Sequence, residues 1–345
     1  MKEARLCTPA ELTKSNVVSS RIRLARNVRG LAFPRSGKRA DEKLLDVIKG
    51  AALAAEGLFD FEICLMSRLT KLQKTAFVER HIISLPLANN TATGAVIVER
   101  GTQSMSIMLN EEDHIREQCV VNGYDLKGAY ARLNEYDNRL IKILPIAYDR
   151  QLGFITACPT NLGTGMRASA MLFLPALKRA GAIEDALSTF KKEYGLTVRG
   201  VYGEGSDAFC DMYQISNSRT LGLDEKTIIG QVEHAVEAMC YCERAAMEKL
   251  VLEKRAQLLD GIMRSYAVLR SAYSISSGEL AKLIVDVKMG VILDILPIKY
   301  TTAKLDELTV LCSPSSIQIF TGNCSAAERD IRRAQMVRRI LSEDK

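Results

Sequence analysis

Residues 158–169 read Cys-Pro-Thr-Asn-Leu-Gly-Thr-Gly-Met-Arg-Ala-Ser. Pro, Asn and Gly residues placed this close together are typical of a loop. The preceding residues 153–158 (GFITAC) are mostly apolar, and they predict a strand that runs into this loop. Arg167 follows the loop, and a guanidinium group is suited to bind phosphate oxygens in a two-point geometry. The stretch therefore predicts a loop that carries a thiol, Cys158, and a cation.

Three further segments combine arginine with loop-forming residues at the ends of predicted strands. They are residues 19–26 (SSRIRLAR), 110–116 (NEEDHIR) and 198–205 (VRGVYGEG). If the first is extended, Arg21 and Arg23 lie on one face. Each segment alone is typical of a solvated loop, a surface ion pair or, for the basic residues 21–39, a nucleic-acid patch. Together they favour one site, in which guanidinium groups clamp the phosphates of a nucleotide and carboxylates hold a cationic acceptor.

The order of the predicted elements indicates an α+β protein. Helical patterns predict helices over residues 41–59, 125–144, 166–177 and 182–195. Short β-branched segments predict strands over residues 74–85, 94–100 and 104–110, and two strands around a glycine-rich turn within residues 196–217. Residues 224–345 are almost entirely compatible with helix. Mixed elements followed by helices alone predict an α+β catalytic domain over residues 1–253 and an all-helical domain over residues 254–345.

The arginine-containing segments resemble the signature elements of the ATP:guanidino phosphotransferases, or phosphagen kinases. The strongest matches are NEEDHIR (110–116), CPTNLGTGMRAS (158–169), and VRGVYGEGS with QISN (198–206 and 214–217). The resemblance runs from SSRIRLARN (19–27) through RSY (264–266) to ERDIRRA (328–334), so it covers nearly the whole chain. Within the family, the chain is most similar to the bacterial protein-arginine kinases of the McsB type. The resemblance implies an antiparallel sheet flanked by helices, followed by a helical domain that binds phosphoarginine and forms a dimer.

The resemblance also implies roles for individual residues. Glu112 and Glu204 hold the acceptor guanidinium, with Glu112 as the expected base, and Cys158 lies beside that guanidinium as a thiolate. Arg21, Arg23, Arg116, Arg167 and Arg199 line the phosphates of ATP. The full set expected at the nucleotide is Ser19, Ser20, Arg21, Ile22, Arg23, His81, Arg116, Arg167, Ala168, Ser169, Ala170, Met171, Arg199, Gly200, Val201, Tyr202, Gly203 and Glu204. Mg²⁺ is expected on phosphate oxygens and water, because no acidic pair forms an obvious ligand set.

The C-terminal helix carries the motif R-D-x-x-R-A, formed by Arg329, Asp330, Arg333 and Ala334. Arg329 and Arg333 are four residues apart on a helix, so they share a face with Asp330. Alone, the segment is typical of a surface helix with many ion pairs. With the kinase signature upstream, the resemblance implies a phosphoarginine site, in which two guanidinium groups hold the phosphate, Asp330 accepts from the ligand's guanidinium and Ala334 leaves room.

Composition excludes several other classes of protein. Trp is absent and aromatic residues make up 6% of the 345 residues, so an aromatic platform for single-stranded nucleic acid is not expected. Nine scattered cysteines without a C-x-x-C pair, with three histidines, exclude a zinc finger and indicate a reduced, cytoplasmic protein. No apolar stretch approaches ~18 residues and no secretory signal is visible, so neither a membrane span nor export is expected. GEGSDA (203–208) matches a dinucleotide fingerprint only formally, because FCDMYQIS after it predicts a strand instead of a helix.

The resulting hypothesis is an ATP-dependent protein-arginine kinase that marks proteins for Clp-type degradation in the bacterial stress response. Its expected partners are protein substrates, a McsA-like zinc-binding activator, the Clp machinery, a heat-shock repressor and a second copy of the chain; neither nucleic acid nor membrane is expected. One alternative is a kinase of free arginine, which the position of SSRIR at residue 19 disfavours, because no room is left for the family's helical N-terminal domain. Others are a phosphoarginine-binding adaptor with an inactive kinase site and a nucleic-acid-binding module resting on residues 21–39.

Overall fold

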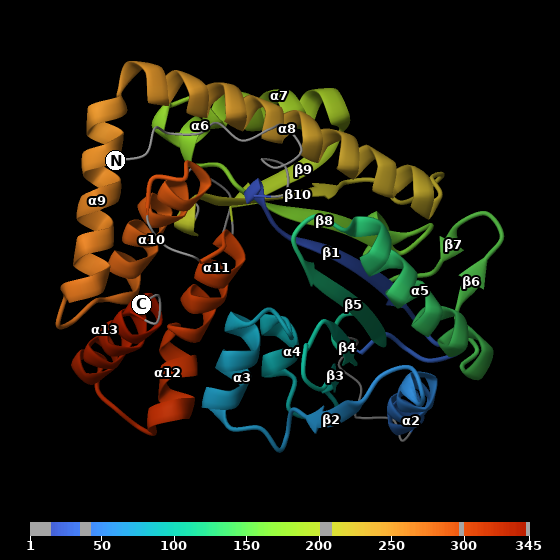
Figure 1. The fold of residues 1–345 in the computed structure, drawn as a ribbon. Coiled ribbons are helices and arrows are strands. Elements are labelled where there is room, and N and C mark those ends of the chain that lie inside the picture. Colours follow the sequence, from blue (N-terminus) through green and yellow to red (C-terminus); the bar gives the residue numbers. More distant parts are fainter. Residues whose placement is uncertain (1–14, 35–42, 201–208, 297–299, 343–345) are drawn as a thin grey trace.

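The computed structural model describes residues 15–34, 43–200, 209–296 and 300–342 (Figure 1). Its centre is an eight-stranded sheet with the order β2-β3-β4-β5-β1-β8-β10-β9, in which every neighbouring pair is antiparallel. The strands are β1 (Val17–Arg26), β2 (Phe61–Leu65), β3 (Ala95–Glu99), β4 (Met105–Leu109), β5 (Ile115–Asn122), β8 (Met166–Phe173), β9 (Leu196–Gly200) and β10 (Met212–Asn217). A separate hairpin joins β6 (Tyr148–Asp149) to β7 (Gly153–Phe154).

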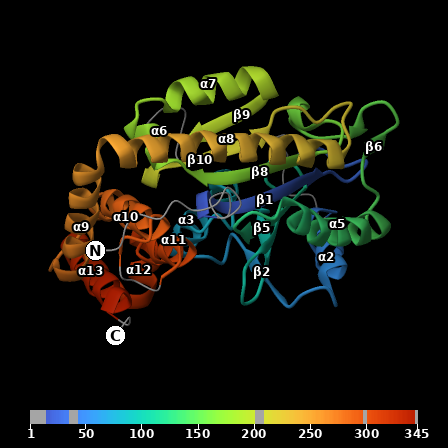
Figure 2. The same ribbon diagram turned by 45° about the horizontal axis from the view of Figure 1, so that its top comes forward.

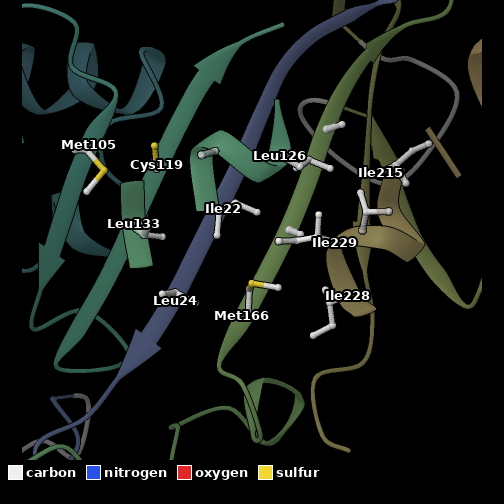
Figure 3. Close-up of a cluster of buried hydrophobic side chains, with 14 of the residues drawn as sticks. Ile22, Leu24, Met105, Cys119, Leu126, Leu133, Met166, Ile215, Ile228 and Ile229 are labelled. Atoms are coloured by element: carbon white, nitrogen blue, oxygen red, sulfur yellow. The ribbon is translucent and has the colours of Figure 1, made fainter. Parts of the chain in front are cut away.

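Alternating side chains give the sheet two chemically different faces. On β1, Ile22 and Leu24 are buried among apolar side chains, whereas Arg21 and Arg23 point to the other side. The apolar face is covered by α2 (Lys43–Ala55), α5 (Leu126–Ile143), α7 (Ile183–Tyr194) and α8 (Glu225–Glu253). Figure 3 shows Ile22 and Leu24 of β1 packed with Leu126 of α5 and Ile229 of α8. The main core therefore lies on one side of the sheet, and the opposite face of the central strands is left for polar groups.

Two short helices pack on the opposite face, over the β2–β4 end of the sheet. They are α3 (Lys71–Glu79) and α4 (Leu85–Asn89), and they share a small core with Met66, Val96 and Met108. Met108 is paired with Arg116 of β5, so these helices lie on the same side of the sheet as the arginines.

The helical segment that follows forms a second core. It comprises α9 (Arg255–Ser271), α10 (Ser277–Ile292), α11 (Thr302–Leu311), α12 (Pro314–Thr321) and α13 (Ala326–Ser342). Phe173 at the end of β8 and Ala176 of α6 (Pro175–Arg179) are part of this core, so it is continuous with the end of the sheet. Helix α8 crosses the covered face of the sheet and leads to α9 (Figure 2), and α12 packs against α3. None of the described helices combines the length and the apolar character needed to span a membrane.

The predicted fold class, α+β with an antiparallel sheet and a helical C-terminal part, is confirmed. The strand predicted over residues 74–85 is wrong, because α3 begins at a capping box that joins Thr70 to Gln73 and a second helix starts at the Ser84 cap. The helix predicted over residues 166–177 is also wrong. Its first eight residues form β8, which is held between β1 and β10 in the middle of the sheet. Of the strand predicted over residues 153–158, only Gly153–Phe154 is extended and paired.

Candidate active site

Four arginines converge on the uncovered face of the central strands, and we call this set (Arg21, Arg23, Arg116 and Arg167) the arginine face. In the strand register, Arg23 of β1 is the partner of Arg167 on β8. On the other side of β1, Ala25 is the partner of Arg116 on β5. Because paired residues of antiparallel strands share a face, three adjacent strands aim their guanidinium groups at one region.

The arginine face is electrostatically crowded. Burial, followed by the charges of Arg116 and Arg167, lowers the pKa of Arg21 from 12.5 to about 10. Burial and three neighbouring guanidinium groups also hold the pKa of Arg23 well below its ordinary value. Among the described residues, the buried Nε of Arg23 finds no hydrogen-bond partner. A polyanion such as a triphosphate would relieve this repulsion and supply the missing acceptors.

Contacts with strand β10 hold two of these arginines in place. Arg21 donates from Nη2 to Gln214 Oε1 at 3.1 Å, and Arg167 donates from Nη2 to Ser216 Oγ at 2.9 Å. Both acceptors lie on β10, two residues apart, so they belong to one face. The guanidinium positions are therefore fixed before any ligand arrives.

Arg116 is held by Glu111, which is almost fully buried. Arg116 Nη1 donates to Glu111 Oε2 at 2.9 Å, and Ser84 Oγ donates to Glu111 Oε1 at 2.7 Å. Burial alone would raise the pKa of Glu111, but the charge of Arg116 and these hydrogen bonds lower it below its ordinary value. Glu111 is thus an ionised partner of the arginine face.

The other predicted nucleotide residues divide between the two faces. Ser19, Ser169 and Met171 lie in register on the side of the arginines. Ser20 bonds to Gly123 O on the covered side, and Ile22, Ala168 and Ala170 are buried in the main core. The prediction that these last four residues contact the nucleotide is therefore restricted to their backbone atoms.

His81 lies at the end of α3 with a left-handed backbone (φ 58°). Its carbonyl accepts a hydrogen bond from Gln118 Nε2 at 2.8 Å, and Gln118 is the β5 partner of Arg23. Desolvation, followed by the charge of Arg21, lowers the pKa of His81 below 6.5. The structure thus brings His81 to the edge of the arginine face.

The acidic segment NEEDH forms a tight turn between β4 and β5. Asn110 N bonds to His114 O at 2.8 Å, and Glu111 N bonds to Asp113 O at 3.1 Å. Glu112 is half-buried at the tip of this turn, and none of the described residues forms a hydrogen bond or ion pair with its side chain. Of the three acidic residues, Glu112 is therefore the one available to a ligand.

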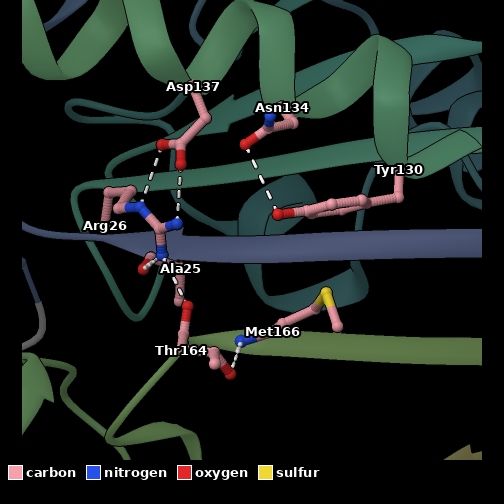
Figure 4. A network of polar contacts seen from close by, with 7 residues as sticks. All are labelled: Ala25, Arg26, Tyr130, Asn134, Asp137, Thr164 and Met166. Carbon is pink, nitrogen blue, oxygen red and sulfur yellow. Dashed lines mark hydrogen bonds and ion pairs between the residues drawn. The ribbon is translucent and has the colours of Figure 1, made fainter. Parts of the chain in front are cut away.

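The loop with Cys158 is anchored by Arg26 (Figure 4). Arg26 Nη1 donates to Thr164 O at 3.0 Å, while its Nε and Nη2 pair with the carboxylate of Asp137 on α5. A Cβ at Gly165 would lie 2.7 Å from Ala25 O, so only glycine permits this approach of loop and strand. Within the loop, Cys158 Sγ lies 3.1 Å from Thr160 Oγ1.

Several predicted site residues lie outside the described part of the chain. They are Val201, Tyr202, Gly203 and Glu204. Gly200 is the last residue of β9, and for Arg199 only the backbone is described, paired with Gln214 of β10. Whether Glu112 and Glu204 reach a common ligand is therefore left as a prediction.

The R-D-x-x-R-A motif lies on α13, as predicted, but its members have different surroundings. Arg333 is buried, donates from Nε to Cys312 O (2.9 Å) and from Nη1 to Ile275 O (2.8 Å), and pairs with Asp330. Arg329 is half-buried and donates to Cys324 O. Ala334 is fully buried in the second core, and its role beside a ligand stays a prediction.

The chain is similar to known proteins over nearly its whole length. The family model described as "ATP:guanido phosphotransferase, C-terminal catalytic domain" matches residues 44–246, and that described as "Protein-arginine kinase McsB C-terminal domain" matches residues 255–345. A protein-arginine kinase of Caldanaerobacter subterraneus subsp. tengcongensis is 38% identical over 96% of this chain and 98% of its own. One from Bacillus cereus (strain ATCC 10987 / NRS 248) is 39% identical over 95% of this chain and 93% of its own.

Solved structures show the same fold. A lombricine kinase superposes with a TM-score of 0.56 at 26% identity and covers 71% of each chain. The duplicated taurocyamine kinase from Schistosoma mansoni, with bound transition state analog components, gives a TM-score of 0.60 at 22% identity. It covers 81% of this chain and 41% of that one.

Proposed function

Because the chain belongs to the ATP:guanido phosphotransferase family, in its McsB-type protein-arginine kinase branch, we propose that it transfers the γ-phosphoryl group of ATP to arginine side chains of proteins. The observation that carries this proposal is the arginine face, where burial, followed by the charges of neighbouring arginines, lowers the pKa values of Arg21 and Arg23. Such a site favours a polyphosphate over any neutral ligand. The names of the full-length relatives support arginine in a protein as the acceptor.

The arginine face would act mainly on the phosphates. In phosphoryl transfer, negative charge is spread over the oxygens of the group in flight, and catalysis is largely positioning and charge stabilisation. Arg21, Arg116 and Arg167 are already held by Gln214, Glu111 and Ser216, so they need little reorganisation on binding. Among the described residues no three metal-ligating side chains form a cluster, so Mg²⁺ would be held by phosphate oxygens and water.

The acceptor would be handled by Glu112 and Cys158, with Glu204 as the second carboxylate. A guanidinium is cationic and delocalised, so one nitrogen must lose a proton to become a nucleophile. Glu112 takes this proton as the nitrogen attacks the γ-phosphorus, the bond from phosphorus to the bridging oxygen breaks and ADP leaves. A carboxylate is a weak base for this purpose, so orientation of the guanidinium supplies most of the rate.

The test is incubation with ATP and either casein or free arginine, followed by mass spectrometry at neutral pH that scores N-phosphorylated arginine. We expect modified casein, and loss of the modification in Glu112→Gln but not in Arg332→Ala, an exposed arginine on α13. Phosphorylation of free arginine alone would favour the small-guanidine kinase. Binding of phosphoarginine without any transfer would favour the adaptor, and full activity of Glu112→Gln would contradict the assigned base.

We also propose that α13 binds phosphoarginine through Arg329 and Asp330, with Arg333 orienting Asp330. Arg333 serves several carbonyl groups, so Arg329→Ala is the better probe of binding. Calorimetry with free phosphoarginine tests this site on α13: the affinity should fall in Arg329→Ala and be kept in Arg332→Ala.

The resemblance further supports a division of the chain at residues 253/254, a homodimer and a cytoplasmic location. It also supports a McsA-like activator, and a role in Clp-type degradation with a heat-shock repressor as partner.

A further inference from the structure

A single carboxylate oxygen joins the two segments that carry Glu112 and Cys158. Asp113 Oδ1 accepts a hydrogen bond from Ala157 N at 2.7 Å. Asp113 follows Glu112 directly, and Ala157 precedes Cys158 directly. The shortest connection between the expected base and the expected thiolate therefore runs through this one hydrogen bond.

Asn27 reinforces the connection from the end of β1. Its Nδ2 donates to Asp113 Oδ1 at 2.7 Å and to Ile155 O at 3.0 Å, and its Oδ1 accepts from His114 N at 2.9 Å. One amide side chain thus bonds to both segments. Because β1 is a central strand of the sheet, Asn27 ties both segments to the most rigid part of the fold.

The burial of Asp113 and Asn27 indicates that these two side chains hold a fixed geometry. Asp113 and Asn27 are each 2% exposed, and a buried carboxylate is costly unless hydrogen bonds satisfy it. The bonds recorded for Asp113 come from a backbone amide and a side-chain amide. Such neutral donors fix a position without supplying a counter-charge, which distinguishes Asp113 from Glu111 and its partner Arg116.

We propose that Asp113 and Asn27 are positioning residues that set the separation of Glu112 and Cys158, and thereby the plane in which the acceptor guanidinium is held. The inference rests on the proposed function and deepens it. Among the described residues, neither side chain bonds to the arginine face, which is held by Gln214, Ser216 and Glu111. Asp113 bonds to Glu111 through its backbone carbonyl, which a substitution of the side chain leaves in place. Loss of the clamp should therefore affect the acceptor and leave the binding of ATP unchanged.

The test compares Asp113→Ala, Asp113→Asn and the control Asp149→Ala. Asp149 also accepts two backbone N–H bonds, from Gln151 and Leu152, but lies exposed in the β6–β7 hairpin. For Asp113→Ala we expect kcat/KM for casein to fall about 100-fold, since small misplacements of reacting groups cost this much. The affinity for ATP, measured without acceptor, should stay unchanged. Asp113→Asn keeps an acceptor oxygen and should restore most of the activity.

Three outcomes would overturn the inference: equal loss of ATP and casein binding, equal behaviour of Asp113→Ala and Asp149→Ala, or failure of Asp113→Asn to recover activity although it folds. If Asp113→Ala does not fold, Asp113→Asn and Asn27→Ala carry the comparison. Hydrogen exchange at the amide of Ala157 gives a readout that needs no catalysis. If the wild-type chain does not phosphorylate arginine, the proposed function fails. The clamp is still established if hydrogen exchange at the Ala157 amide is slow in the wild type and faster in Asp113→Ala.

Discussion

Arg26 and Asp137 form a buried two-point ion pair, with Nε–Oδ1 at 2.9 Å and Nη2–Oδ2 at 2.7 Å. The remaining nitrogen of Arg26 donates to the carbonyl groups of Ala25 and Thr164, and the ring of Phe154 lies 3.6 Å from its guanidinium carbon. One side chain therefore fastens β1 to α5 and to the loop that carries Cys158.

Replacement of Arg26 by leucine should destabilise the protein strongly. Asp137 would be left buried without its cation beside Glu117, and breaking a buried pair costs about 3–5 kcal/mol. The matched control is Arg132→Leu, which breaks the more exposed pair with Glu99 and should cost about 1 kcal/mol or less. Urea unfolding at neutral pH measures both, and equal losses would contradict the structural role of Arg26.

Glu117 should make stability fall as the pH rises. Burial, followed by the charge of Asp137, raises the pKa of Glu117 well above 4.5, and a hydrogen bond between the two carboxyl groups adds to this shift. The folded state therefore keeps a proton that the unfolded chain releases above pH 4.5, so stabilisation is present below that pH and is lost at higher pH.

In Glu117→Gln this contribution is absent. The free energy of unfolding of the variant, relative to the wild type, should grow between about pH 5 and pH 8. Glu135→Gln, an exposed position on α5, is the control and should show a constant difference. A constant difference for Glu117→Gln as well would mean that Glu117 is ionised in the fold.

The two-residue period of β1 could be predicted from the sequence, but strand β8 could not. Arg21 and Arg23 alternate with Ile22 in a pattern that any extended segment shows. Residues 166–173 contain no β-branched side chain, so local propensity favours a helix, and pairing with β1 and β10 decides the outcome. The helices of residues 125–144 and 182–195 were predictable because their apolar periodicity is local.

The acidic triplet shows why the site could be predicted only in part. Glu111, Glu112 and Asp113 are adjacent, and their spacing does not reveal which one is free. The answer depends on Arg116, which pairs with Glu111, and on Ala157, which bonds to Asp113. Arg26 carried one usable signal, because in SSRIRLAR it falls on the side of Ile22 and Leu24, and a charge on the covered face must have a buried partner.

Removal of one charge from the arginine face should stabilise the free protein and impair catalysis. Burial, followed by the charges of Arg21, Arg116 and Arg167, lowers the pKa of Arg23. Arg23→Met removes this buried charge and its repulsion of the neighbouring arginines, so thermal stability without ATP should rise. Phosphorylation of casein should fall about 100-fold or more, since one charge-stabilising donor is lost. Arg29→Met, an exposed control just beyond β1, should change neither quantity. If the Arg23→Met variant is less stable than the wild type and still phosphorylates casein, the arginines of the arginine face do not repel one another as proposed.

The contact between Glu79 and Ser315 should couple α3 to α12. The Glu79 carboxylate accepts from Ser315 N and Ser315 Oγ, each at 3.1 Å, so it caps the first turn of α12. Glu79→Ala should cost about 1 kcal/mol and speed amide exchange at the start of α12. In a double-mutant cycle with Ser315→Ala, we expect a coupling energy of at least about 0.5 kcal/mol. Additive effects would show that the two helices are held by apolar packing alone.

Arg333 and Arg332 are neighbours on α13, but their replacement by alanine should change the stability of the protein to very different extents. Arg333 is only 1% exposed. Its replacement by alanine leaves three acceptors without their donor: the carbonyl groups of Cys312 and Ile275 and the carboxylate of Asp330. Each buried acceptor left unsatisfied costs about 1–3 kcal/mol, so the second core should unfold at markedly lower urea. Arg332 is exposed, and Arg332→Ala should change stability by less than about 0.5 kcal/mol. A loss of phosphoarginine binding in Arg333→Ala is therefore informative only at temperatures where circular dichroism shows that the helices are intact. If the Arg333→Ala variant is as stable as the wild type, the bonds of Arg333 to these carbonyl groups do not hold the domain together.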